Sequence, residues 1–249
     1  MKAVILAAGR SKRIQPPIGI PKAMIKIGDK TLLEHSLSNL NRCGITEVII
    51  LVGYLSEKII KKIGNKYESM KIKYIINDVY DQTDNLYSLW LAKSEFNDNL
   101  IYMDADILYD IRALKKVVES NYENTVLVGK LNTDSGEEMK VFGEKGVAKK
   151  IGRGSEIQDY TKSPLIGEAI GIVKISSKHI KTLIYNMDYL IKNKRFSMSH
   201  EDLTQIMCEN KLMNYVYIED LPWVEIDFSE DILRAEKEIY PKIQKGDKK

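Results

Sequence analysis

The chain has 249 residues, of which 44% are hydrophobic and 29% are charged, and its formal net charge at pH 7 is +3. This profile is typical of a soluble globular protein, and part of the basic excess lies in a polar tail from Lys242 onward, so no nucleic-acid partner is expected. No run approaches the roughly 18 apolar residues of a membrane-spanning helix. Cys43 and Cys208 lie far apart and in no metal-ligand spacing, which predicts reduced thiols in a cytoplasmic protein without a membrane partner.

The first half of the chain alternates apolar strands with amphipathic helices. We expect strands at residues 2–7, 47–52, 72–76 and 100–107, and helices at 31–43, 56–63 and 84–93. Strands that are apolar throughout are typical of parallel sheets buried on both faces. The pattern therefore predicts an α/β fold with a mainly parallel, Rossmann-like sheet and helices on both faces.

The second half changes character. Short strands are expected at residues 126–129, 139–142, 147–151, 169–175, 215–218 and 223–226, with helices at 179–192 and 201–209 and a closing helix, capped by Ser229, that runs to 239. We interpret this half as a small inserted β/α substrate subregion. The chain is predicted to be a single domain with two parts, residues 1–130 and residues 131–249, the second of which includes the closing helix.

The first strand leads directly into small residues, Leu6-Ala7-Ala8-Gly9, which let backbone N–H groups approach an anion at the carboxyl edge of the sheet. Arg13 and Lys22 follow and supply cationic donors for a polyphosphate. The P-loop pattern and the Gly-x-Gly-x-x-Gly pattern do not occur here, which argues against a P-loop NTPase and a dinucleotide oxidoreductase. A flexible surface loop with solvated bases is the competing interpretation.

This loop resembles the nucleotidyltransferase superfamily of sugar-phosphate and alcohol-phosphate pyrophosphorylases. Their signature, Leu-Ala-Ala-Gly-x-Gly-x-Arg followed by Pro-Lys, stands here as Leu6-Ala7-Ala8-Gly9-Arg10-Ser11-Lys12-Arg13 and Pro21-Lys22. Ser11 replaces the second glycine, and a serine at this position is also similar to the molybdopterin nucleotidyltransferase branch.

Two acidic pairs lie at strand ends, Asp104-Ala105-Asp106 and Glu225-Ile226-Asp227. Residues two apart in a strand share a face, so each pair is expected to present two carboxylates on one side. Like charges at the end of a buried strand need a cation or hydrogen-bond donors to offset them. Mg²⁺ binds through one or two carboxylates together with water and phosphate oxygens, so one carboxylate from each pair would suit it.

A narrower resemblance is to bacterial CTP:phosphocholine cytidylyltransferases. Matching stretches are Asn77-Asp78, Asn85-Leu86-Tyr87-Ser88-Leu89 and the two acidic pairs. The resemblance implies that Asp106 and Asp227 hold Mg²⁺, with Asp104 and Glu225 as second choices. It also implies that CTP is the nucleotide and that Arg13 and Lys22 act on its phosphates.

The remaining site residues are predicted from their chemistry and place in the sequence: Tyr87 and Trp223 lie next to motif positions, Glu168 on a late strand, and Glu201 and Asp202 at a helix start. Backbone groups from Leu6 to Gly9, with Asn85 and Ser88 opposite, are expected to bind the nucleotide and to read a pyrimidine edge. A cationic acceptor needs carboxylates or aromatic faces, and the candidates are Tyr87, Glu168, Glu201, Asp202 and Trp223. Each also has a structural interpretation, such as helix capping for Asn85, a helix N-terminus for Glu201 and Asp202, or core packing for Trp223.

The predicted activity is transfer of CMP from CTP to a small phospho-alcohol or phosphonate, similar to phosphocholine, with release of pyrophosphate. The acceptor phosphate is largely dianionic at neutral pH and needs no general base. His35, His179 and His200 are accordingly interpreted as surface or packing residues. Two alternatives stay open: a sugar-1-phosphate or inositol-phosphate nucleotidyltransferase, and a non-catalytic nucleotide-binding regulator on the same fold.

Overall fold

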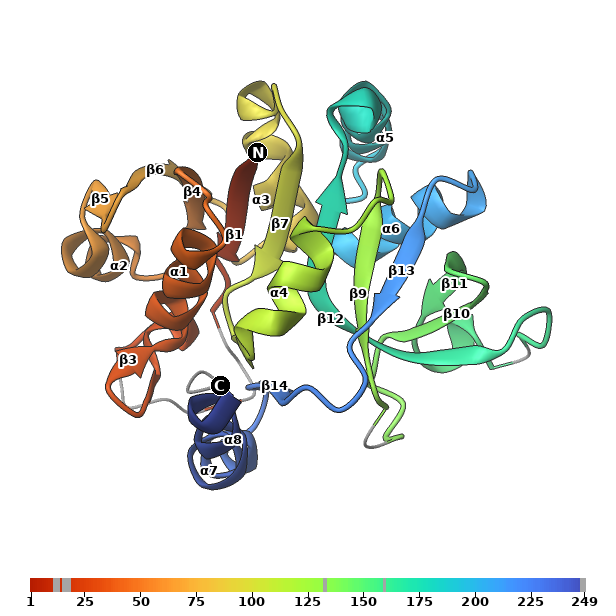
Figure 1. Ribbon diagram of the computed structural model, residues 1–249. Coiled ribbons are helices and arrows are strands. Elements are labelled where there is room, and N and C mark those ends of the chain that lie inside the picture. The colour runs from red at the N-terminus through yellow and green to blue at the C-terminus, as the bar shows by residue number, and fades with distance from the viewer. Residues whose placement is uncertain (11–13, 15–18, 132–133, 159, 247–249) are drawn as a thin grey trace.

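The computed structural model describes the whole chain except residues 11–13, 15–18, 132–133, 159 and 247–249. Within the described residues, a large sheet is built from strands β1 (Lys2–Ala7), β4 (Glu47–Val52), β5 (Lys66–Tyr67), β6 (Met70–Ile76), β7 (Leu100–Asp104), β9 (Thr125–Gly129), β10 (Lys140–Glu144), β11 (Val147–Gly152), β12 (Leu165–Ile175) and β13 (Asn214–Tyr217). Their order across the sheet is β10-β11-β13-β9-β12-β7-β1-β4-β6-β5 (Figure 1).

The two halves of this sheet differ in strand direction. Strands β7, β1, β4 and β6 pair in parallel, as the alternating pattern predicts. Strand β12 runs antiparallel to both of its long neighbours, β7 and β9, and β10 and β11 form the predicted hairpin. The expected α/β fold is therefore confirmed, with a parallel nucleotide half continued into a mixed, largely antiparallel second half.

Helices cover both faces of the sheet because its central strands alternate between two apolar sides. In β1, Ala3, Ile5 and Ala7 pack with one core, and Val4 and Leu6 pack with the other. Helices on the first side are α1 (Leu32–Arg42), α2 (Ser56–Ile63) and α4 (Ile111–Val118). Those on the second are α3 (Asn85–Leu91), α5 (Ile180–Lys192) and α6 (His200–Glu209), as Figure 1 shows.

A smaller third core lies near the C-terminus. Strand β14 (Trp223–Glu225) pairs antiparallel with β8 (Ile107–Tyr109), and the short hairpin of β2 (Lys26–Ile27) and β3 (Lys30–Thr31) lies against the closing helices. These are α7 (Ser229–Arg234), a π-helical segment (Ala235–Ile239) and α8 (Tyr240–Gly246). The backbone N–H of Ile226 donates to the Asp106 carbonyl at 3.0 Å. This pairing brings the late acidic pair beside the early one.

Two local predictions need correction. The expected strand 100–107 ends at Asp104 and resumes as β8 at Ile107, so the chain bends at Ala105 and Asp106.

The predicted cap of the closing helix is also wrong, because Ser229 does not cap it. Instead, the Asp231 carboxylate reaches back to accept from the backbone N–H groups of Asp227 and Phe228, at 2.9 and 2.7 Å. An acidic residue in the first helical turn can satisfy such N–H groups in place of the preceding side chain.

None of the helices in the described part of the chain is long and apolar enough to cross a membrane. Both cysteines are free, with Cys208 buried and Cys43 partly buried.

Candidate active site

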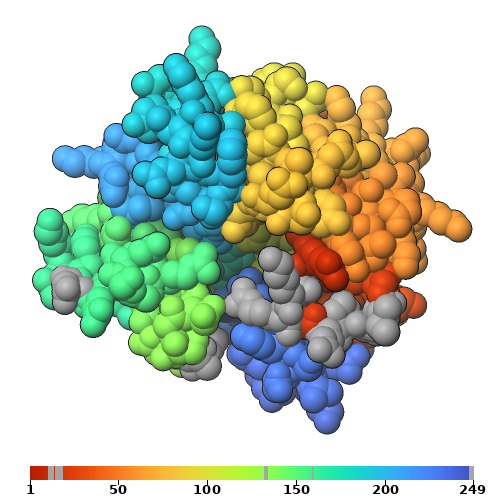
Figure 2. Space-filling view, turned by 180° about the vertical axis from the view of Figure 1, so that it is seen from behind, coloured from red at the N-terminus to blue at the C-terminus, as the bar shows by residue number. Residues whose placement is uncertain are grey.

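A cleft of about 750 Å³ opens at the carboxyl ends of the parallel strands. Its wall includes the loop after β1, the first turn of α3, the bend after β7, part of β12 and the start of α7. Figure 2 shows this face hollowed between the green segment around β10–β12, the yellow segment around α3 and the blue C-terminal helices. Both halves of the chain thus contribute to one cavity.

Lys22 lies at the centre of the cleft between two carboxylates. It begins a short 3-10 helix, Lys22–Met24, and its Nζ donates to Asp106 Oδ2 at 2.6 Å and to Asp227 Oδ1 at 2.8 Å. The lysine side chain is 14% exposed. Burial by itself lowers the pKa of Lys22, but the charges of Asp106 and Asp227 outweigh it and raise the pKa above its ordinary value. Lys22 is therefore protonated at neutral pH, and its two ion pairs connect the segments that carry Lys22, Asp106 and Asp227.

The donor set around Lys22 is suited to a divalent cation. Ligand oxygens of Asp106, Glu225 and Asp227 lie within 4.8 Å of one another. Asp106 Oδ1 is buried and has no hydrogen-bond partner among the described residues. Burial, and then the neighbouring carboxylates, raise the pKa of Glu225 well above its usual range. An oxygen-only cluster with excess negative charge is the chemistry that Mg²⁺ prefers, so these residues fit the predicted metal.

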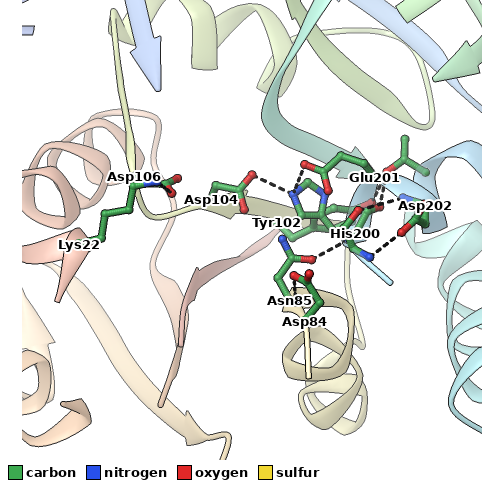
Figure 3. A network of polar contacts seen from close by, with 11 residues as sticks. Lys22, Asp84, Asn85, Tyr102, Asp104, Asp106, His200, Glu201 and Asp202 are labelled. Carbon is green, nitrogen blue, oxygen red and sulfur yellow. Dashed lines mark hydrogen bonds and ion pairs between the residues drawn. The ribbon is translucent and has the colours of Figure 1, made fainter. Parts of the chain in front are cut away.

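A second charged group lies beside this centre. The His200 ring is 1% exposed, and its Nε2 lies 2.8 Å from Asp104 Oδ2 and 3.2 Å from Glu201 Oε1 (Figure 3). Burial lowers the pKa of His200, but the two carboxylates raise it to about 10. Asp104 is thereby paired with a histidine instead of joining the acidic cluster around Lys22. The interpretation of His200 as a surface or packing residue missed this pairing.

The predicted nucleotide residues line one end of the cleft, namely Leu6, Ala7, Ala8, Gly9, Asn85 and Ser88. A side chain at Gly9 would meet no atom within 4 Å, so the loop leaves open space there. Ser88 is buried and accepts from the Asn77 amide at 3.0 Å. Asp84, and not Asn85, caps α3, whereas Asn85 Oδ1 accepts from the backbone N–H of His200 at 2.7 Å. Asn85 therefore joins α3 to α6.

Three of the five predicted acceptor residues, Glu168, Glu201 and Trp223, also line the cleft. Glu201 follows His200, whose backbone N–H donates to Asn85, so it lies beside the predicted nucleotide residues. Trp223 is 7% exposed and packs in the core.

The structure places Tyr87 and Asp202 outside the cleft lining. Tyr87 packs against Trp90 and Phe196, and its position on α3 turns it away from the cleft-lining Asn85 and Ser88. Asp202 accepts from the backbone N–H of Ser199 at 2.7 Å and so completes the capping box of α6.

Glu138, Arg153 and Arg234 also line the cleft, and no motif could have revealed them. Glu138 and Arg234 lie close enough to Glu168 to act on its pKa, and these three residues define what we call the acceptor end. Glu138 closes a turn by accepting from the backbone N–H of Ser135 at 2.9 Å. Burial, followed by repulsion from Glu138, raises the pKa of Glu168 to about 7. Arg13, predicted to bind phosphate, lies outside the described residues.

The described geometry combines a small-residue loop, a lysine and an oxygen-donor cluster in one cleft. Residues 3–160 match the model of the MobA-like NTP transferase domain. The chain belongs to this family. It is a nucleotidyltransferase, and the resemblance inferred from the loop signature is confirmed.

Individual relatives of this nucleotidyltransferase differ in how much of the chain they match. The CTP:phosphoglutamine cytidylyltransferase of Campylobacter jejuni is 28% identical over 93% of this chain and 98% of its own length. The CMP-5'-(3-aminopropyl)phosphonate synthase of Streptomyces rubellomurinus is 30% identical, but the match covers 47% of this chain and only 19% of that protein. The CTP:phosphocholine cytidylyltransferase structure from Streptococcus pneumoniae has a TM-score of 0.79 at 23% identity and covers 95% of this chain and 97% of its own. That likeness confirms the fold.

Proposed function

We propose that this nucleotidyltransferase is a Mg²⁺-dependent cytidylyltransferase, which transfers CMP from CTP to a small phosphate or phosphonate carrying a cationic amine. The observation that carries the proposal is the position of Lys22 between Asp106 and Asp227 in a cleft that is also lined by the small-residue loop and by the carboxylates of Glu168 and Glu201. In this proposal the chain works as a single domain, with residues 1–130 on the nucleotide side and residues 131–249 on the acceptor side.

The chemical step is a displacement at phosphorus. An oxygen of the acceptor phosphate forms a bond to the α-phosphorus of CTP, and the bond from this phosphorus to the oxygen bridging to the β-phosphate breaks. Pyrophosphate leaves with that electron pair. The acceptor phosphate loses its second proton at a pKa of about 6, so it is already a nucleophile at neutral pH. This agrees with a cleft whose lining includes none of the histidines His35, His179 and His200.

Catalysis then depends on position and charge. Lys22 would donate to phosphate oxygens around the reacting phosphorus, and we propose that Arg13 contacts the leaving pyrophosphate. Asp106 and Asp227 would hold the metal, with Glu225 as the third oxygen donor in reach. When bound, Mg²⁺ would stabilise negative charge that moves onto the leaving group.

The preference for CTP rests on the nucleotide end of the cleft. Ala7, Ala8, Gly9, Asn85 and Ser88 all line the cleft. The Asn85 carbonyl is already engaged by His200, which leaves its NH₂ group to donate. The carbonyl oxygen and ring nitrogen of cytosine are acceptors, which suits such a donor. The cytidylyl relatives named above support this assignment.

The acceptor class rests on the carboxylates of the cleft. Glu168 and Glu201 line it, as does the largely buried Trp223. A cation that reached the face of this ring would gain about 0.5–2 kcal/mol. The relatives' names combine a phosphate or phosphonate with a nitrogen-containing group. We therefore propose phosphocholine, 2-aminoethylphosphonate or a close amine analogue as the acceptor.

Pyrophosphate release across four nucleotides and a set of acceptors tests this proposal. We expect turnover with CTP and an amine-bearing phosphate or phosphonate, and little with ATP or GTP. Equal rates with purine nucleotides would contradict the assignment of the base site. Faster turnover of inositol phosphate or a sugar 1-phosphate would contradict the amine site while leaving the nucleotide site intact. Absence of pyrophosphate release with every pair would instead support a regulatory nucleotide-binding protein.

A further inference from the structure

One face of α7 lies along the cleft, directly after the centre formed by Lys22, Asp106 and Asp227. Asp231 and Arg234 are three residues apart on this helix, the spacing that puts two side chains on one face, and both line the cavity together with Asp227. The Asp231 carboxylate accepts from the backbone N–H of Asp227 at 2.9 Å and so fixes the start of the helix. Side chains on a helix lean toward its N-terminus, which in α7 is the end next to Asp227. Arg234 is therefore directed along the cleft toward this centre.

The guanidinium of Arg234 is a cation without a close partner. The side chain is partly buried, and no salt bridge or hydrogen bond joins it to any other residue that the structure describes. Lys22, by contrast, is held by two carboxylates at hydrogen-bond distance. A guanidinium carries five N–H donors and keeps its charge in proteins, so donors that are left unpaired away from water cost free energy. An anionic ligand in the cleft would offset this cost.

The acceptor end also brings Arg234 near a carboxylate. Burial and then Glu138 raise the pKa of Glu168, whereas the charge of Arg234 lowers it, and Asp227 acts on the same carboxyl group. Within the described part of the chain, no ion pair joins Arg234 to Glu168, although both line the cavity. A cation and an anion thus lie near each other in one cleft without neutralising each other in a direct contact. Such an arrangement suits a small ligand that carries both charges.

We propose that Arg234 binds the phosphate or phosphonate group of the acceptor, while Glu168 receives its amine. This inference rests on the proposed function and deepens it, because it assigns the anionic end of the acceptor as well as its cationic end. The acceptor phosphate must reach the α-phosphorus of CTP near Lys22, and its amine lies only a few bonds away. The planar guanidinium can donate two parallel hydrogen bonds to two phosphate oxygens, which leaves the third oxygen to attack.

Kinetics of Arg234→Ala test the inference. We expect the acceptor KM to rise about tenfold or more, with the KM for CTP unchanged within about twofold. Arg234→Lys is a second variant, which keeps the charge but cannot form the two parallel hydrogen bonds, and it should raise the acceptor KM about threefold. Arg195→Ala is the matched control, because Arg195 is exposed and lies outside the cleft lining, and it should change neither constant. Equal rises in KM for CTP and acceptor would overturn the inference.

Calorimetric titration tests the same contact without turnover. Phosphocholine and 2-aminoethylphosphonate carry both charges, whereas choline and ethylamine carry only the cation. Arg234→Ala should weaken binding of the first pair about tenfold and leave binding of the second pair unchanged within about twofold. Equal weakening of both pairs would overturn the inference, because general distortion of the cleft has that signature. Absence of turnover in the unmodified protein would contradict the proposed function, and the titration would still decide whether Arg234 binds the phosphate group.

Discussion

The transfer centre and the acceptor end of the cleft balance their charges differently. At the transfer centre, Lys22 is held by Asp106 and Asp227 at hydrogen-bond distance. At the acceptor end, no side-chain ion pair or hydrogen bond within the described residues holds the carboxylate of the partly buried Glu168, and burial and Glu138 raise its pKa to about 7 against the opposing charge of Arg234. A partly buried carboxylate that lacks a close donor costs free energy that a bound cation would offset. The difference suggests that the charges of the transfer centre are preorganised for a common reaction. At the acceptor end, by contrast, the substrate itself would supply the missing cation.

The largest expected effect is at the acidic cluster. Replacing Asp106 or Asp227 by asparagine removes a charge from the proposed metal site and should lower kcat by about a hundredfold or more. The rate at saturating CTP and acceptor, measured over a range of Mg²⁺ concentrations, checks this. Glu230→Gln is the matched control, since Glu230 is exposed three residues from Asp227. Near-normal turnover in both aspartate variants would remove these residues from the metal site.

Lys22→Ala is expected to come next, with kcat lowered by about a hundredfold and the KM for CTP raised by about threefold or less. The reason is that a donor near the reacting phosphorus matters most as charge moves to the leaving group. Steady-state kinetics separate the two constants, with the exposed Lys26→Ala as control. A change confined to KM would make Lys22 a binding residue only.

A smaller effect is expected at Glu168, and it depends on pH. Because the carboxyl must ionise to attract an ammonium group, the acceptor KM should fall as pH rises through about 7. Glu168→Gln should raise the acceptor KM about fivefold above this pH and little below it. Measuring variant and unmodified protein at each pH removes the contribution of the acceptor's own phosphate. Parallel profiles for the two proteins would show that Glu168 does not contact the amine.

The raised pKa of Glu168 affects stability in the opposite direction: a rise in pH favours acceptor binding but lowers the free energy of unfolding. A carboxyl whose pKa is higher in the folded than in the unfolded protein binds more protons when folded, so its contribution makes stability fall as pH rises from about 4.5 to about 7. Denaturant unfolding should show this fall weakened in Glu168→Gln. Acceptor binding thus requires the ionised form of Glu168, whereas its protonated form is the one that favours stability.

The contrast between the two ends also explains what the sequence could and could not predict. The loop from Leu6 to Gly9 and the two acidic pairs have local signatures, and the strand pattern placed them at one edge of a sheet. The acceptor end is assembled from distant segments that carry no signature. His200 and Asp104 are 96 positions apart, and nothing in a histidine that precedes two acidic residues indicates which carboxylate it meets. Tyr87 was chosen because it lies next to a motif, but helix geometry turns its ring toward other aromatic rings. Asp202 was chosen as a carboxylate at a helix start, and the helix uses it as a cap.

The most direct test of the central claim follows the phosphorus atoms of CTP. The protein is incubated with Mg²⁺, phosphocholine or 2-aminoethylphosphonate, and CTP labelled with ³²P either at the α- or at the γ-phosphate. Transfer of CMP at the Lys22 centre predicts that the α-label appears in a cytidine-linked product, the γ-label appears only in pyrophosphate, and both signals are lost in Lys22→Ala. Appearance of the γ-label in the acceptor product, or unchanged labelling in Lys22→Ala, would contradict the account.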